Sequence, residues 1–419
     1  MFKPLAPTTN SEVKTLHKLS KNGLSQDPFE VVRFNDEPKI PTYICQPNKQ
    51  AINRYFCNEA YGQGSALNAT VAKLKSIAEF LERLAINNPR KADLIKQEYI
   101  EGPCADPNLF VHYSDVQIKL HNELQKGLKG NTYLWSSAFD YLNKKKILVP
   151  SQLIYISDLF RNETLIASEQ ITTGAALGDR PKSVFESGFL EVVERDAFMI
   201  SYLTKRKLAR ITLFPESINE LISYLKRYYI DILVFDITTD LCIPAFMAIA
   251  VDRRGFGPGI SVGLKAGFDA ESVIFGSILE AVQPRRQSRY SKELDGAKFK
   301  FPTEHEIDSM PKRYYYWYPT KMIKHLDFWL KSNKTVRFAR MPEYATALKE
   351  GIGQLKDRDY HIYYADITLK EINKIGFIAA KVLIPELHPL YLSENSKFLY
   401  SAHGGNIKPA KGLKPHPFA

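Results

Sequence analysis

Cysteine and histidine are too few and too scattered in this chain to build the common metal or nucleophilic sites. The four cysteines, Cys45, Cys57, Cys104 and Cys242, form no CxxC pair, and the nine histidines include no HExxH. This spacing predicts neither a zinc site nor a disulfide framework. A Walker A loop and a GxGxxG turn after a strand are also missing. Any nucleotide chemistry must therefore use an unorthodox site.

Long apolar runs are missing as well. The longest, from Cys242 to Val251, is too short to span a bilayer and contains Pro244, and the first residues lack the apolar stretch of a secretory signal. We therefore expect a soluble, cytoplasmic protein with no membrane association. The 419 residues carry a net charge of +11, which indicates an anionic partner such as a nucleotide, a nucleic acid or an acidic peptide.

Three segments with helical periodicity carry one acidic pattern. They are Glu79-x-x-Glu82-Arg83, Glu191-x-x-Glu194-Arg195 and Glu280-x-x-Gln283-x-Arg285. Side chains three apart share a helix face, and apolar neighbours place each pair close to buried surface. Partly buried carboxylates need cations, and Mg²⁺ bridging a polyphosphate satisfies both the acids and the arginines. A single copy is typical of a solvated surface helix, but the repetition in EFLERLA and EVVERDA disfavours that interpretation.

The rest of the chain divides into short predicted elements. Residues 1–60 are expected to form an irregular lead-in with strands at 30–34 and 41–44. A glycine turn at 62–65, either a plain loop or an anion contact, precedes a helix capped by Asn68 or Thr70 that runs to about Ile86. Residues 131–156 predict two strands joined by a turn, and residues 172–178 predict a small-residue loop. The second acidic helix is expected to begin near Pro181 and Ser183.

An internal repeat is predicted in the second half of the chain. Residues 215–251 and 344–385 each read as helix, strand and strand, with Asp-Ile-Thr at 236–238 and 366–368. We expect both aspartates to be structural, at turns after strands. Between the repeats lies an irregular-looking stretch, 288–334. Its basic and aromatic run, 312–318, is interpreted as a half-buried strand in preference to a platform for nucleic-acid bases. The proline-rich end, 408–419, is expected to be extended and able to reach into a groove.

Taken together, these elements resemble the YcaO family, whose ATP-dependent members activate backbone amides of ribosomally made peptides. The resemblance covers about residue 62 to the C-terminus. Five elements carry it, in chain order. They are the glycine turn with the first acidic helix, the Thr-Gly-Ala-Ala-x-Gly loop before the second acidic helix, Asp236 to Asp240 with Ile243-Pro244, the third acidic motif at 280–285, and Pro415-His416-Pro417-Phe418. It implies an α+β fold of mixed sheets and packed helices built from repeated α/β units. Residues 61–419 would form the catalytic domain and residues 1–60 a lead-in.

The resemblance also implies ATP and Mg²⁺ as cofactors and assigns residues to them. Metal ligands would be Glu79, Glu82, Glu191, Glu194 and Glu280. The same glutamates would also contact ATP, together with Lys75, Ser76, Arg195, Gln283 and Arg285, whereas Arg83 is the motif arginine that could instead be structural. Glu191, Arg195 and the carboxylate of Ala419, at the end of a tail that assists cyclisation in azoline-forming members, would be catalytic.

Some positions depart from the family pattern. Gly62-Gln63-Gly64 stands where relatives have GKG, Lys75 stands where a serine is usual, with Ser76 displaced by one, and Asp179 and Ser183 replace Asn and Glu. Lys75 remains able to serve a phosphate as a point charge.

The implied activity is cyclodehydration of Cys, Ser or Thr in a precursor peptide to thiazoline or oxazoline, by phosphorylation of the backbone amide oxygen. No enzyme nucleophile is needed in this reaction. Because the lead-in is short and lacks a cysteine-rich metal site, we expect a separate E1-like partner that binds the leader peptide. A flavin-dependent azoline dehydrogenase is a further candidate partner, and a homodimer within a larger complex is expected. Thioamidation, and a non-catalytic scaffolding or nucleic-acid-binding subunit, remain the alternatives.

Overall fold

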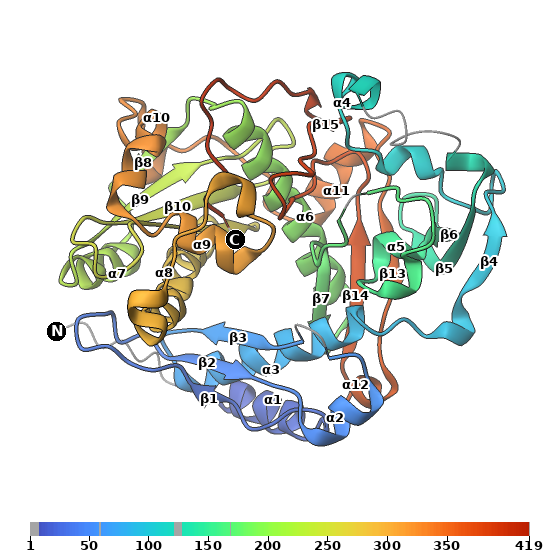
Figure 1. The fold of residues 1–419 in the computed structure, drawn as a ribbon, viewed down its shortest axis with the longest axis horizontal. Helices are drawn as coiled ribbons and strands as arrows, with labels where there is room; N and C mark the ends of the chain where they lie inside the picture. The colour runs from blue at the N-terminus through green and yellow to red at the C-terminus, as the bar shows by residue number, and fades with distance from the viewer. Residues whose placement is uncertain (1–7, 58–59, 121–127, 168, 419) are drawn as a thin grey trace.

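Three β-sheets, each packed against one long helix that carries an acidic motif, make up most of the fold (Figure 1). The computed structural model describes residues 8–57, 60–120, 128–167 and 169–418. The motif helices are α3 (Ala69–Ile86), α6 (Pro181–Leu203) and α8 (Ala270–Asp295). The mixed architecture confirms the predicted α+β class.

The sheets differ in size and strand order. The N-terminal sheet has the order β1 (Phe29–Glu30), β2 (Thr42–Cys45), β3 (Gly62–Ser65). The second has the order β11 (Ile260–Ala266), β10 (Ala245–Asp252), β9 (Ile230–Asp236), β8 (Ala209–Thr212), β12 (Thr335–Arg337), in which only β12 and β8 run parallel. The third has the order β4 (Ile95–Glu98), β5 (Thr132–Asp140), β13 (Tyr363–Asp366), β14 (Ile378–Leu383), β7 (Ala175–Gly178), with β6 (Lys145–Pro150) on β5. Strands β3, β11 and β7 are therefore sheet edges.

Nine shorter helices complete the described part of the fold. They are α1 (Asn10–Ser20), α2 (Lys49–Arg54), α4 (Asp115–Leu120), α5 (Ser151–Ile154), α7 (Glu216–Lys226), α9 (Met310–Tyr316), α10 (Asp327–Leu330), α11 (Leu348–Lys356) and α12 (Lys370–Lys374). A small hairpin, β15 (Tyr400–Ser401) and β16 (Gly405–Asn406), lies near the end of the chain. Within the described ranges, no helix has both the length and the apolar character needed to cross a bilayer.

The glycines at 62 and 64 form a strand rather than the predicted turn. Strand β3 lies directly on α3, and a Cβ added at Gly64 would stand 2.1 Å from the carbonyl oxygen of Ala72. The small residues are there because the strand and the helix backbone touch. The prediction of a loop at 172–178 is also wrong, because residues 175–178 form the edge strand β7, which pairs with β14. Asn68, and not Thr70, caps α3, because its side chain accepts a hydrogen bond from the backbone N–H of Thr70.

The internal repeat is confirmed. In both units a helix leads into two antiparallel strands, α7 with β9 and β10, and α11 with β13 and β14. The turn after the first strand is made in the same way each time: Asp236 Oδ1 accepts from the backbone N–H of Thr238, and Asp366 Oδ1 from that of Thr368, both at 2.9 Å. The two aspartates are structural, as predicted.

The aromatic run at 312–318 is wrongly predicted as a strand. Residues 310–316 form α9, and the following Trp317 and Tyr318 are 1% and 2% exposed. The indole N–H of Trp317 donates to the carbonyl of Pro415 at 3.0 Å, so the run supports the C-terminal tail. Tyrosine-rich segments have no fixed secondary structure of their own, and here packing against the tail favours a helix. The N-terminal part is also more regular than expected, because residues 10–20 form α1, which packs on α3.

His403 connects the β15–β16 hairpin to the motif helix α6. Its Nδ1 lies 2.7 Å from Asp196 Oδ2 and its Nε2 lies 2.6 Å from Asp240 Oδ1. Burial opposes the charge on the imidazole, but the two carboxylates outweigh it and raise the pKa of His403 to about 9. Because Asp196 directly follows Arg195, this contact fixes the helix beside its acidic motif.

The glycine contacts make a stability prediction. We expect Gly64→Ala to lower the free energy of unfolding by at least about 2 kcal/mol, because the added methyl forces β3 away from α3. In contrast, Gly353→Ala in α11, where nothing lies within 4 Å, should raise it by about 0.5–1 kcal/mol. Urea denaturation of the two variants measures both effects. Equal stabilities would contradict the packing role of Gly64.

His403 makes a second prediction, about pH. Its pKa is higher in the folded protein than in the unfolded chain, so its contribution is complete below about pH 6.5 and is lost as the pH rises through about 9. We expect the wild type to lose on the order of 3 kcal/mol more than His403→Gln over that interval. Chemical denaturation at several pH values tests this. Parallel pH profiles for the two proteins would show that the imidazole carries no charge in this contact.

Candidate active site

The three acidic motifs, far apart in sequence, meet between two adjoining cavities. The cavities, about 240 Å³ and about 560 Å³, have a common wall. This wall is made of Gln63 from β3, Glu79 and Glu82 from α3, Glu191 and Arg195 from α6, and Glu280 and Gln283 from α8. Glu194 lines the larger cavity but not the smaller one. All five predicted metal-binding glutamates therefore face one shared space.

Backbone groups of the edge strands hold three of these carboxylates. Glu79 Oε2 accepts from the N–H of Gln63 at 2.7 Å, which is donated from edge strand β3. Edge strand β11 donates two more hydrogen bonds, from Leu264 to Glu280 at 2.8 Å and from Ala266 to Glu194 at 3.1 Å. An edge strand has N–H groups without a partner in its sheet. The site is built where such edges meet the motif helices, and this is why the carboxylates are held in place.

A small residue three positions before the first glutamate accompanies every motif. These residues are Ser76, Gly188 and Ser277, and each lies where its helix touches a strand: Ser76 beneath Gly62, Gly188 beside Gly174, and Ser277 beneath Gly263. Ser76 is fully buried, its hydroxyl donates to the carbonyl of Lys73 at 2.8 Å, and it lines neither cavity. The structure thus places Ser76 in strand packing, away from the space where a nucleotide contact was expected.

The motif arginines divide into two kinds. Arg83 and Arg195 lie four residues after Glu79 and Glu191, on the same helix face, and pair with them at 2.7 Å and 3.1 Å. Arg285 lies five residues after Glu280, which turns it about 140° away from that face. It is 0% exposed, pairs with other residues on the far side of α8, and lines neither cavity. The structure therefore places Arg285 outside the space where a nucleotide contact was expected.

Crowding of like charges sets the electrostatics of the wall. Burial, followed by repulsion from Glu194, raises the pKa of Glu280 to about 7. Burial also raises the pKa of Glu191, and burial with repulsion from Glu191 and Glu79 holds the pKa of Glu82 well above its usual range. The wall has four carboxylates and one arginine, Arg195, so it is short of positive charge.

The larger cavity supplies cations opposite the carboxylates. Lys75 from α3 and Lys265 from β11 both line it, next to the edge of β7. Loss of hydration, followed by repulsion from the charge of Lys265, lowers the pKa of Lys75. Two ammonium groups from different elements suit an anion with several oxygens, such as a chain of phosphates. Lys265 was not predicted, because a single lysine in the strand ISVGLKA matches no motif.

The smaller cavity is lined by aromatic side chains, one of them from the C-terminal tail. Tyr61, Tyr314, Tyr315 and Phe418 line it. The Phe418 ring lies 4.2 Å from the guanidinium carbon of Arg195, so the tail reaches the acidic wall as predicted. It is fixed there by buried hydrogen bonds: the hydroxyl of Tyr202 donates to the carbonyls of Lys414 and Pro415, and Arg313 to that of His416. Ala419, the predicted catalytic carboxylate, lies outside the described residues.

The donor set fits magnesium held jointly with phosphate. Over the described part of the chain, no three His, Cys, Asp or Glu side chains come close enough to enclose a metal by themselves. Mg²⁺ is usually bound by one or two carboxylates together with substrate phosphates, so a protein cage is not required. The cation-deficient wall between two lysines and two arginines supplies the carboxylate half of such a site. Glu79, Glu82, Glu191, Glu194 and Glu280 are the residues that would hold it.

Comparison with known proteins identifies the architecture. Residues 63–388 match the family model of the YcaO cyclodehydratases, described as ATP- and Mg²⁺-binding. An uncharacterized protein in the tfuA 3' region of Rhizobium leguminosarum bv. trifolii is 31% identical over 121 residues, which are 27% of this chain and 28% of that protein.

Solved structures have the same fold at low identity. A heterocyclase in complex with substrate and cofactor matches with a TM-score of 0.67 and 16% identity over 94% of this chain, and this chain spans 53% of its length. YcaO from Methanopyrus kandleri, bound with AMPPCP and Mg²⁺, matches with a TM-score of 0.65 and 17% identity over 95% of this chain and 96% of its own. The E. coli Microcin synthetase McbBCD complex with pro-MccB17 bound matches with a TM-score of 0.66 and 15% identity over 94% of this chain and 96% of the matched chain.

The matched range contains all three acidic motifs and both cavity lysines, while the tail and the first 62 residues lie outside it. The chain belongs to the ATP- and Mg²⁺-binding YcaO family.

Proposed function

We propose that the chain is an ATP- and Mg²⁺-dependent cyclodehydratase that converts Cys, Ser or Thr residues of a precursor peptide into thiazoline or oxazoline. The observation that carries the proposal is the acidic wall, with a cavity that contains Lys75 and Lys265 on one side and an aromatic cavity lined by Phe418 on the other. A nucleotide and a peptide have to meet at one point in this reaction, and two cavities with a common wall allow it.

The residues would divide the work by position. Lys75 and Lys265 would hold phosphate oxygens in the larger cavity, and the five glutamates would orient Mg²⁺ at the wall. When bound, ATP supplies the phosphoryl group that turns the amide oxygen of the peptide into a leaving group. Arg195, between Glu191 and Glu194, would stabilise negative charge developing at the wall. Tyr314, Tyr315 and Phe418 would position the peptide and exclude water from it.

The peptide's own side chain would be the nucleophile. A thiol or hydroxyl of Cys, Ser or Thr attacks the preceding carbonyl carbon, the amide oxygen departs as phosphate, and the ring closes with net loss of one water. The protein contributes binding, orientation and charge, which agrees with a site built from carboxylates and cations.

Partners follow from the same proposal. We propose a precursor peptide as substrate, an E1-like protein that binds its leader, a homodimeric arrangement of this chain, and a flavin-dependent dehydrogenase acting on the product. The nucleic-acid alternative is disfavoured, because Tyr316, Trp317 and Tyr318 are buried and offer no exposed stacking surface. Thioamidation stays as the alternative within the family, and the mass of the peptide product distinguishes it: cyclodehydration removes one water per ring, and thioamidation exchanges oxygen for sulfur.

The carboxylates make the first test. We expect Glu191→Gln and Glu280→Gln to lower peptide-dependent ATP hydrolysis by about 100-fold or more, because each removes a metal-binding charge from the wall. Hydrolysis and product mass are measured with the purified chain, its leader-binding partner and the precursor. Glu220→Gln, on an exposed face of α7, is the control and should keep full activity. Wild-type turnover in the two site variants would reject this site.

The lysines make a separate prediction. Lys265→Met removes a phosphate-facing charge while keeping the length of the side chain, so KM for ATP should rise by roughly tenfold. Steady-state kinetics at fixed peptide concentration measure the change. Lys331→Met, at a pair on the exposed surface, should leave KM unaltered. A KM for ATP that is the same in all three proteins would place the phosphates elsewhere.

A further inference from the structure

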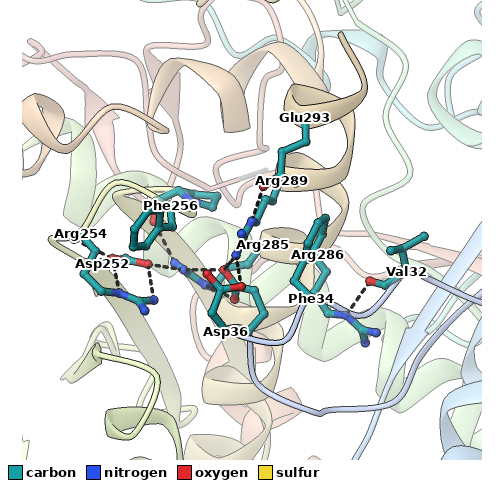
Figure 2. Close-up of polar contacts among 12 residues, drawn as sticks. Val32, Phe34, Asp36, Asp252, Arg254, Phe256, Arg285, Arg286, Arg289 and Glu293 are labelled. Atoms are coloured by element: carbon teal, nitrogen blue, oxygen red, sulfur yellow. Dashed lines mark hydrogen bonds and ion pairs between the residues drawn. The ribbon is translucent and has the colours of Figure 1, made fainter. Parts of the chain in front are cut away.

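The back of helix α8 carries three arginines that the proposed reaction does not use. The front face of the helix, with Glu280, Gln283 and Gln287, lines the smaller cavity. Residues 285, 286 and 289 lie on the opposite side of a helix with 3.6 residues per turn. All three arginines are buried, at 0%, 3% and 8% exposure (Figure 2). Buried guanidinium groups need partners, and the identity of these partners shows what the arginines do.

Arg285 joins the helix to two other parts of the chain. Its Nη2 lies 2.7 Å from Asp252 Oδ2, at the end of β10, and 3.3 Å from Glu37 Oε1. Its Nη1 donates to the carbonyl of Pro258 at 2.8 Å. A Cβ at Gly257 would stand 2.3 Å from Nη2, so the loop after β10 is shaped around this guanidinium. Glu37 and Asp252 are 1% and 0% exposed, which makes this a closed cluster without access to a nucleotide.

The other two arginines bind the same N-terminal segment. Arg286 donates to the carbonyls of Val31 and Ile40 at 2.8 Å and 2.6 Å. Arg289 donates to Asp36 Oδ1 at 2.8 Å, and its guanidinium carbon lies 4.4 Å from the ring of Phe34. Residues 31–40 therefore follow the back of α8 for more than one helical turn, as Figure 2 shows for Val32, Phe34 and Asp36.

The helix needs this support at the point where it carries the site. Pro284 stands inside α8 and has no N–H, so it leaves the backbone carbonyl of Glu280 without its helical hydrogen bond. A proline in a helix interior kinks the helix unless the surroundings fix it. The weakened turn connects Glu280 with Arg285. Contacts made after the proline therefore decide how Glu280 and Gln283 are aimed at the cavity.

We propose that Glu37 and Arg285 are positioning residues: residues 31–40 clamp the back of α8 and thereby hold Glu280 and Gln283 in register with the other two motifs. This inference rests on the proposed function of the same site. The clamp lies outside the region that matches the family, which begins at residue 63, so it makes the N-terminal segment part of this chain's active site. Buried ion pairs add little net stability, but they select one arrangement of the elements they join.

A double-mutant cycle between Glu37→Gln and Arg285→Lys tests the clamp. Each single variant should lower kcat for peptide-dependent ATP hydrolysis by roughly 10- to 100-fold, since small displacements at a reacting centre have effects of that size. The apparent Mg²⁺ requirement should rise in each, while KM for ATP changes little. The double variant should be no worse than either single one, because both remove the same contact. Arg90→Gln, at an exposed pair with Asp93 outside this segment, is the control and should behave as the wild type.

Each other outcome overturns the inference in a recognisable way. If Arg285 touched the nucleotide, Arg285→Lys would raise KM for ATP, and its effect would add to that of Glu37→Gln. If the cluster served stability alone, the variants would melt earlier but keep wild-type kcat and Mg²⁺ dependence once corrected for the folded fraction. Glu37→Asp, which keeps the charge, provides the same readout if Glu37→Gln does not fold. A wild-type protein without ATP turnover would instead reject the proposed function.

Discussion

The structure depends on holding several negatively charged side chains close together against their mutual repulsion. Three helices bring five carboxylates together along the larger cavity, and Arg83 and Arg195 pair with Glu79 and Glu191. Such an arrangement raises the pKa values of its acids and favours any cation that enters. The rest of the fold can be understood as the means of keeping these groups together. Sheet edges donate N–H groups to the carboxylates, and small residues let each helix lie close to its strand.

The same device is repeated around the site. Ser76 and Ser277 precede their glutamates by three residues and pack beneath glycines of β3 and β11, and Gly188 takes that place in α6. The chain thus builds its centre from copies of one strand-and-helix contact. Differences between the copies give the two cavities their character: Lys75 and Lys265 face one side, and the tyrosines and Phe418 face the other. One wall can therefore serve two ligands of different chemistry.

Much of this was predictable from local pattern. The acidic helices and the α/β repeat with its two Asp-Ile-Thr turns follow from spacing and composition, and the structure confirms them. The position of the tail beside the acidic wall was implied by the family resemblance. The failures have a common cause. Gly62 and Gly64 suit a turn as well as a strand pressed against a helix, and only the presence of α3 decides between them. The aromatic run forms a helix that packs against the tail, a contact between distant segments that local pattern does not show. Arg285 lies on another face of α8 than Glu280, because a spacing of five residues changes the helix face.

Nucleotide binding with and without Mg²⁺ tests the central claim most directly. Isothermal titration calorimetry of the purified chain with AMPPCP would measure it. If the carboxylates act through a metal, they repel the free triphosphate, and Mg²⁺ should increase the affinity by roughly 100-fold or more. Equal affinity with Mg²⁺ and with a chelator present would contradict the account, because the acidic wall would then have no part in binding the nucleotide.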